Sequence, residues 1–419
     1  MSKKLLIRNV GPIEDITINI KKINIFMGKQ SSGKSTIAKI LSFCNWVEKD
    51  ISFHQSYEKY TNEYFIERLE TFHKMKGYFY PNSEIIYEGD AITIEYSNKR
   101  LKIDWLASRF EYKRTKISYI PAERSMVILP EMEKIELPNN YLRSYLYDWL
   151  DTRKNYTSDK TFSVLDIGAN YYYSDDKKES HITNGDYDIL LSQASSGLQS
   201  VIPLLTMVDN LIINLYKEES KSSYELDEVK AKVTRLIVNK FIIDEYFKDD
   251  INDNNRNEKL DELNDLLIKN DEKIQPLIRK FAEVRDNLFN THKTNLIIEE
   301  PEQNLFPSTQ KKLCYKLLNY LNNDYDHSLT LTTHSPYILY AINNCILTYL
   351  VKNKIPADLK DRITCYNSSI SPTDVNIFEI KNGVINNIQQ DNGLIGENYF
   401  DSQMKKVMDD FYFLLNFLD

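Results

Sequence analysis

The stretch Gly28-Lys29-Gln30-Ser31-Ser32-Gly33-Lys34-Ser35 decides the fold, because it fits the spacing GxxxxGK[ST] in full. An apolar, strand-like run at residues 23–27 leads into it, and residues 35–41 behind it have helical spacing without a breaker. Glycines let such a loop turn successive backbone N–H groups inward, and the start of a helix adds a positive end. Strand, loop and helix therefore predict a binding site for a phosphate chain.

The ligand predicted for this loop is a nucleotide with its metal ion. A lysine at the position of Lys34 can reach the β- and γ-phosphates, and the hydroxyl of Ser35 can hold Mg²⁺. We expect ATP to contact the loop and the residue that follows it, namely Gly28, Lys29, Gln30, Ser31, Ser32, Gly33, Lys34, Ser35 and Thr36.

A second apolar strand ends in acidic residues, in the run Leu296-Ile297-Ile298-Glu299-Glu300-Pro301-Glu302. The first acid, Glu299, is expected to bind Mg²⁺ through water. The second, Glu300, is expected to polarise the water that attacks the terminal phosphate. Together with Lys34, this pair predicts hydrolysis as well as binding.

A third apolar strand runs into Thr332-Thr333-His334-Ser335-Pro336. A lone histidine after a strand is usually structural. Because His334 follows the glycine loop and the acidic strand end in chain order, it is predicted to contact the terminal phosphate or the attacking water. The catalytic set is therefore Lys34, Glu300 and His334.

A fourth motif, Ser195-Ser196-Gly197-Leu198-Gln199, is weak when taken alone. A helix that starts there would offer N–H groups and a serine hydroxyl to an anion. The same subunit needs no second phosphate clamp, so the natural user is the nucleotide of a second protomer. We expect Ser195, Ser196 and Gly197 to act across a subunit interface.

Composition limits the class of protein. The chain has 419 residues, of which 42% are hydrophobic and 27% charged, with a net charge of −8. This balance predicts an ordinary core and argues against a surface coated for nucleic acid. Four cysteines without a CxxC pair predict reduced thiols, and no signal peptide or apolar stretch near 20 residues is evident. We expect a cytoplasmic protein that does not enter a membrane.

The pattern along the chain predicts an α/β fold with a mixed sheet and a helical insertion. Strands are expected at residues 5–10, 16–20, 84–87, 91–96, 117–121, 295–298 and 328–331, with a hairpin at 375–388, helices between 126 and 173, and a last helix at 402–418. The charged segment 209–290 predicts two antiparallel helices of about 30 residues, roughly 45 Å each, around a polar break at 249–257. The ATPase domain would then comprise residues 1–208 and 291–419.

The order of these motifs resembles a known group. Residues 7–13 (IRNVGPI), the glycine loop, residues 119–125 (YIPAERS), residues 195–199, residues 299–307 (EEPEQNLFP) and residues 333–336 (THSP) follow one another over nearly the whole chain. Together they resemble the ABC/SMC-like AAA ATPases of bacteria, the group that includes the ATPase halves of OLD-type nucleases and the anti-phage systems PARIS and Septu. The resemblance implies ATP and Mg²⁺ as cofactors, His334 as the switch histidine, and Ser196 and Gly197 as signature contacts across a head-to-tail dimer.

Two positions depart from the pattern of that group. Leu198 stands where a second glycine is common, and Glu123 lies near the place of the usual glutamine. The resemblance further implies a homodimer or higher oligomer that holds a separate effector, such as a nuclease, because only 85 residues follow His334 (419 − 334) and show no acidic nuclease pattern.

Other functions stay open from the sequence. The main alternative is an SMC-like DNA repair or recombination ATPase that clamps DNA. Two basic clusters could serve it: Arg143, Arg153 and Lys154, or Arg109, Lys113, Arg114 and Lys116. Solvated faces are the simpler interpretation of both clusters. A transporter ATPase and a nucleotide-binding protein without turnover are further alternatives.

Overall fold

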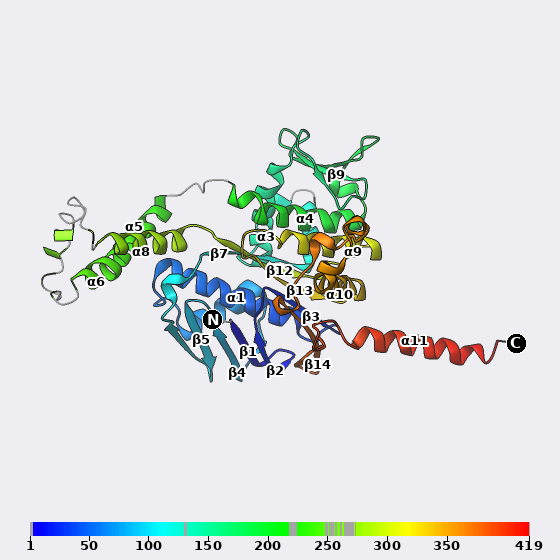
Figure 1. Cartoon of the computed structure of the whole chain (residues 1–419), viewed down its shortest axis with the longest axis horizontal. Helices are drawn as coiled ribbons and strands as arrows, with labels where there is room; N and C mark the ends of the chain where they lie inside the picture. Colours follow the sequence, from blue (N-terminus) through cyan, green and yellow to red (C-terminus); the bar gives the residue numbers. More distant parts are fainter. Residues whose placement is uncertain are drawn as a thin grey trace.

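The computed structural model describes residues 3–129, 132–217, 224–247 and 274–418, together with residues 250, 255, 258, 259, 262, 263 and 272. A mixed sheet of eleven strands forms its centre (Figure 1). The strands follow the order β6 (Arg100–Trp105), β5 (Ile92–Ser97), β4 (Phe79–Glu88), β1 (Lys4–Val10), β2 (Ile13–Asn19), β15 (Val384–Asn387), β14 (Val375–Lys381), β3 (Ile23–Gly28), β13 (Ser328–Thr333), β12 (Lys293–Glu299) and β7 (Thr115–Ile120).

The two halves of this sheet differ in strand direction. The strands β14, β3, β13, β12 and β7 pair in parallel with one another, while β14 pairs antiparallel with β15. The strands β6, β5, β4, β1 and β2 pair antiparallel. Parallel neighbours carry their C-terminal ends to one edge, so the ends of β3, β12 and β13 meet there. The predicted α/β class and mixed sheet are confirmed.

Both faces of the sheet are covered, because the buried side chains of β3 alternate between two cores. Phe26 packs with α1 (Lys34–His54) and α2 (Asn62–His73). Met27 packs with helices on the other face: α3 (Tyr141–Thr152), α4 (Ser196–Ile212), α9 (Pro307–Tyr320) and α10 (Pro336–Val351). The loop between β3 and α1 is therefore held by two well-packed elements.

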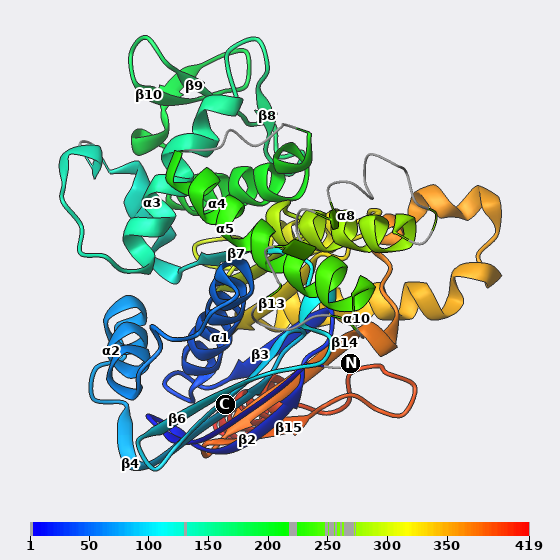
Figure 2. The ribbon, with the colours of Figure 1, turned by 90° about the vertical axis from the view of Figure 1, so that its left-hand side faces the viewer.

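A second, four-stranded sheet contradicts the expectation of helices throughout residues 126–173. It contains β8 (Phe162–Ser163), β9 (Asn170–Ser174), β10 (Glu179–Thr183) and β11 (Asp188–Leu190). In β9 the side chains of Tyr171 and Tyr173 are buried while Tyr172 is half-buried, which is strand alternation. Figure 2 shows this sheet at the opposite end of the molecule from β4 and β6. Antiparallel pairing with residues 179–183 decides the local structure here.

The insertion forms an arm that extends away from the sheet (Figure 1). Its described helices are α5 (Tyr224–Val238), the π-helical turn Asn239–Ile243, α6 (Asp244–Tyr246) and α8 (Gln275–Phe289). Val233, Ile237, Val284 and Leu288 join the core around α1. Residues 209–212 belong to α4 rather than to the arm. Most of the expected polar break at 249–257 lies outside the described residues, and the three-part division of the chain stays a prediction.

One helical stretch corrects the expectation that no apolar run approaches 20 residues. Ser196–Tyr216 is a helical stretch of 21 residues that contains an 18-residue window with a mean hydropathy of 1.4, enough by length and composition to cross a membrane. The fold buries 61% of that window, and Val201, Leu204 and Val208 belong to the largest core. The helix is apolar on most of its surface because it is a core helix that packs against neighbours on several sides.

The C-terminal helix α11 (Tyr399–Leu415) leaves the body at the end of β14 and β15 and projects into solvent (Figure 1). None of its residues is buried. Its exposed apolar side chains include Met404, Val407, Phe411 and Leu414. The predicted hairpin before it is present, with Ile380 opposite Ile385.

Candidate functional site

The glycine loop lies between β3 and α1, as predicted. Gly33 adopts a φ of 106°, a left-handed conformation that side-chain-bearing residues rarely adopt, and it forms the N-cap of α1. A Cβ added there would lie 2.3 Å from Cδ1 of Ile13, the first residue of β2. Both the turn geometry and the close packing therefore require glycine at this position.

The side chain of Lys34 folds back over the loop. Its Nζ donates to the carbonyl oxygens of Gly28 at 2.9 Å and Lys29 at 2.7 Å. Burial lowers the pKa of Lys34 to about 8, against the opposing effect of Glu300, Glu302 and Glu299. Both carbonyl contacts are replaceable by phosphate oxygens, so the ammonium group is positioned for an anion in the loop.

The register of the parallel strands brings the separate motifs together. Thr333 pairs with Met27, and Glu299 pairs with Thr332. The backbone N–H of Glu300 then donates to the carbonyl of Thr332 at 2.9 Å. Three sequence motifs that lie far apart in the chain thus end at one edge of the sheet.

Glu300 and His334 contact each other at this edge. Nε2 of His334 lies 3.3 Å from Oε1 of Glu300. The hydrogen bond from His334 lowers the pKa of Glu300 and outweighs the effect of burial, with Lys34 adding to the shift. Glu300 also has a φ of 43°, a strained conformation for a residue with a side chain, which is common at functional sites. The carboxylate is therefore ionised and aimed by its surroundings.

Two further acids shape the same edge. Oε1 of Glu302 accepts a hydrogen bond from the backbone N–H of His334 at 2.6 Å, while burial raises the pKa of Glu302. Glu299 is 4% exposed, and its Oε1 is a buried atom without a hydrogen-bond partner among the described residues. Burial, followed by the charge of Glu299, raises the pKa of Tyr119 well above its ordinary value. A buried, unpartnered carboxylate oxygen beside the glycine loop fits a metal ligand, directly or through water.

Arg124 is a residue whose role the sequence left open. It is fully buried, and its guanidinium donates to the carbonyl oxygens of Glu299 at 2.8 Å and Glu300 at 2.7 Å. Its Nε donates to the carbonyl of Ser200, in α4, at 3.2 Å. Burial lowers its pKa. Arg124 therefore joins the acidic strand end to the helix that begins with the fourth motif. Its place in the run YIPAERS was the available signal.

The fourth motif begins a helix, as expected. Ser195 is the N-cap of α4, and its side chain accepts from the N–H of Leu198 at 3.4 Å. Ser195 and Ser196 are exposed. A Cβ on Gly197 would lie 2.9 Å from the carbonyl oxygen of Asn304, so this end of the helix packs on the loop after the acidic strand. Within the described part of the chain, no hydrogen bond joins residues 195–197 to residues 28–35.

The two basic clusters considered for DNA are largely used within the fold. The Arg153 guanidinium is buried and lies 4.2 Å from the ring centroid of Tyr173. Arg114 donates to the carbonyl of Phe289 at 2.7 Å, and Lys116 pairs with Asp148 at 3.2 Å. Arg153 and Arg114 do not form the solvated faces that the simpler interpretation expected, because aromatic and backbone partners hold them. Part of each cluster still faces solvent, because Lys154 and Lys113 are exposed.

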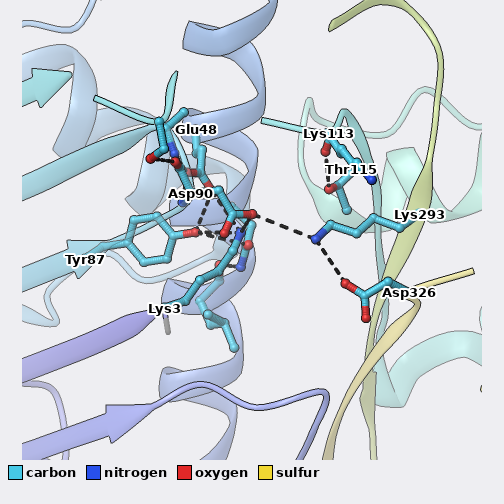
Figure 3. Close-up of polar contacts among 12 residues, drawn as sticks. Lys3, Glu48, Tyr87, Asp90, Lys113, Thr115, Lys293 and Asp326 are labelled. Carbon is cyan, nitrogen blue, oxygen red and sulfur yellow. Dashed lines mark hydrogen bonds and ion pairs between the residues drawn. The ribbon is translucent and has the colours of Figure 1, made fainter. Parts of the chain in front are cut away.

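A polar cluster around Glu48, far along α1 from the glycine loop, holds this helix in place (Figure 3). Glu48, fully buried on α1, accepts from the backbone N–H groups of Asp90 at 2.6 Å and Ala91 at 2.8 Å. It also accepts from the Tyr87 hydroxyl at 2.7 Å and Lys3 Nζ at 3.1 Å. Burial would lower the pKa of Lys3, but Glu48, Tyr87 and Asp90 outweigh it and raise that pKa well above its ordinary value. The cluster ties α1 to the antiparallel half of the sheet.

Comparison of the sequence with models of known families and with curated proteins finds no match. Among solved structures, the chain is similar to the SMC head domain from Thermotoga maritima, at 10% identity and a TM-score of 0.35, over 81% of this chain and 92% of that one. It is also similar to an SMC head bound to the C-terminal winged-helix domain of ScpA, at 10% identity and 0.35, over 92% and 96%. A third is the recombination mediator RecF, at 10% identity and 0.27, over 92% and 98%.

Proposed function

We propose that this protein is an ABC/SMC-like ATPase that binds ATP with Mg²⁺ at the glycine loop and hydrolyses it. One observation carries the proposal: Lys34, Glu300 and His334 come from three separate motifs and lie together where β3, β12 and β13 end. A lysine can bind the phosphates, an ionised carboxylate can activate water, and a histidine can position that carboxylate, which together suit hydrolysis of the terminal phosphoanhydride bond of ATP.

Each residue has a proposed role. The loop residues 28–36 would cradle the phosphates, and Ser35 with Glu299 would hold Mg²⁺, which would supply positive charge to the phosphate oxygens. Glu300 orients the attacking water and accepts its proton, because its lowered pKa keeps it ionised. His334 holds Glu300 and faces the terminal phosphate.

The direct test is the substitution Glu300→Gln. Because a general base contributes about 10²–10⁴-fold to rate, we expect phosphate release to fall at least about 100-fold while ATP binding is kept. The matched control is Glu95→Gln, an exposed acid on β5, which should hydrolyse like wild type. Hydrolysis by E300Q at the wild-type rate, measured by phosphate release, would remove Glu300 from the mechanism.

We further propose that the active form is a dimer or higher oligomer in a bacterial defence system. ATP would be held between protomers, and the arm that follows α4 would contact a separate effector, such as a nuclease. The exposed N-terminus of α4 supports a nucleotide held between protomers, and the projecting arm supports contact with another protein. The proposal of a separate effector comes from the resemblance in motif order to the anti-phage group. The test is co-purification with the product of the neighbouring gene with and without ATP. Neither self-association nor capture of that partner with ATP present would contradict the proposal.

A further inference from the structure

A polar cavity of about 680 Å³ adjoins the glycine loop on the side of the C-terminal helix. Loop residues 29–32 form one wall, the turn at Asn382 and Gly383 forms another, and the first two turns of α11 close it with Tyr399, Ser402, Gln403 and Lys406. Its volume lies in the range of small-ligand sites, roughly 300–1,000 Å³. The proposed catalytic groups at the ends of β12 and β13 are not part of its lining.

We propose that this cavity holds the nucleoside part of the nucleotide, with Tyr399 as the surface on which the base stacks. The inference rests on the proposed function, since it requires the phosphates to occupy the loop. A nucleotide bound by its phosphates must place its ribose and base beside the loop, and this cavity begins at the loop itself. The amides of Gln30, Asn382 and Gln403 offer both donors and acceptors to ribose hydroxyls and base edges.

Tyr399 is the one aromatic side chain among the described residues that line the cavity. The ammonium of Lys29 lies 5.6 Å from its ring centroid, within the range of a cation–π contact. Such a contact at a partly exposed site is weaker than a charge-assisted hydrogen bond to phosphate. A triphosphate in the loop should therefore draw Lys29 away from the ring and leave the ring face open to a base.

The wall that carries Tyr399 is held in place before any ligand binds. Asn398 caps α11, accepting from the N–H of Phe400 at 3.0 Å, and Asp401 accepts from the N–H of Asn398 at 3.2 Å. The hydroxyl of Tyr340, on α10, donates to Asp401. Because α10 begins at Pro336, two residues after His334, the segments that carry His334 and Tyr399 are anchored to the same helix.

The experiment compares ATP with inorganic tripolyphosphate, which has the phosphates and no nucleoside, by calorimetric titration of the full chain. For Tyr399→Ala we expect ATP affinity to fall about tenfold, the range of one base–aromatic stack, and tripolyphosphate affinity to stay within about twofold. Tyr399→Phe, which keeps the ring, should bind both like wild type. Tyr412→Ala is the matched control, since it removes an exposed tyrosine farther along the same helix.

Lys29→Ala separates phosphate binding from base stacking. Losing a phosphate contact should lower the affinity for ATP and for tripolyphosphate alike. The inference is overturned if Y399A binds ATP like wild type, or if it loses both ligands equally. If the wild-type protein binds neither ligand, the phosphate site itself fails. If it binds both and Y399A changes nothing, only the nucleoside cavity fails.

Discussion

Arg124 illustrates how a single buried side chain can organise a site through hydrogen bonds to the backbone. A fully buried guanidinium is costly unless its donors are satisfied, and here carbonyl oxygens from three elements accept them. The planar fork of arginine can reach several acceptors at fixed angles, whereas the single ammonium of lysine cannot. Arg124 therefore sets the position of the Glu299 and Glu300 backbone relative to α4.

At the residue scale, Arg124→Lys tests this arrangement. We expect it to destabilise the fold by about 2 kcal/mol or more, because carbonyl groups lose their partners while a charge stays buried. The measurement is the urea midpoint, combined with ATP turnover and ATP affinity. A positioning role predicts that turnover of the folded variant falls more than affinity does.

Arg143→Lys, at a half-buried position on α3 where Nε donates to the Tyr147 hydroxyl, is the control for Arg124 and should stay within about 0.5 kcal/mol of wild type. Unchanged stability and turnover in R124K would mean that the carbonyl contacts matter for neither.

At the element scale, α1 connects the glycine loop to the antiparallel half of the sheet. Its start is set by Gly33 and its middle by the Glu48 cluster. Because the carboxylate of Glu48 accepts from Lys3 and from two backbone N–H groups in the turn between β4 and β5, it fixes both the rotation and the axial position of the helix. Movement of α1 would change the loop directly.

Glu48→Gln is the corresponding test. The carboxylate of Glu48 accepts hydrogen bonds from four donor groups, and the amide of glutamine would replace one of its acceptor oxygens by an NH₂ donor. The variant therefore leaves buried donors without an acceptor. We expect a loss of about 3 kcal/mol in unfolding free energy, measured as a lower urea midpoint. The exposed Glu95→Gln serves as control, and an unchanged midpoint for E48Q would contradict a structural role for the cluster.

At the scale of the whole molecule, the fourth motif raises the question of which nucleotide it serves. Ser195 and Ser196 are exposed, and the hydrogen bonds of the described residues connect them within α4 rather than to the glycine loop. If the site is assembled from two protomers, two inactive variants with defects in different parts of it should restore activity when they are mixed. A site within one chain would not allow this.

Mixing two inactive variants tests this assembly. Lys34→Ala removes the phosphate contact, and Ser196→Arg blocks the exposed helix start. In a mixed dimer, one composite site keeps both an intact loop and an intact helix start. We therefore expect mixtures to recover a substantial fraction of ATP turnover, whereas each variant alone has little. No recovery on mixing, with both variants folded, would point to sites contained within single protomers.

The parts of the site that the sequence could predict are local. Glycine spacing, an apolar strand before each motif and helical spacing after it depend on neighbouring residues, so the loop, Glu299, Glu300 and His334 could be assigned to strand ends in advance. The α/β class with a mixed sheet follows from the same strands, and the structure confirms it. The proposed chemistry at those ends stays a prediction.

What only the tertiary structure decided depends on contacts across long separations. The small sheet formed because residues 170–174 pair with 179–183, and this pairing overrode the expected helices. Arg124 acquired its role from carbonyls about 175 residues away, and Tyr399 became a wall of the loop cavity from the other end of the chain. Backbone acceptors and cavity walls carry no sequence signature, because any residue offers a carbonyl and any fold can bring a side chain near. The sequence by itself therefore determined the motifs, and the packing of the chain determined their neighbours.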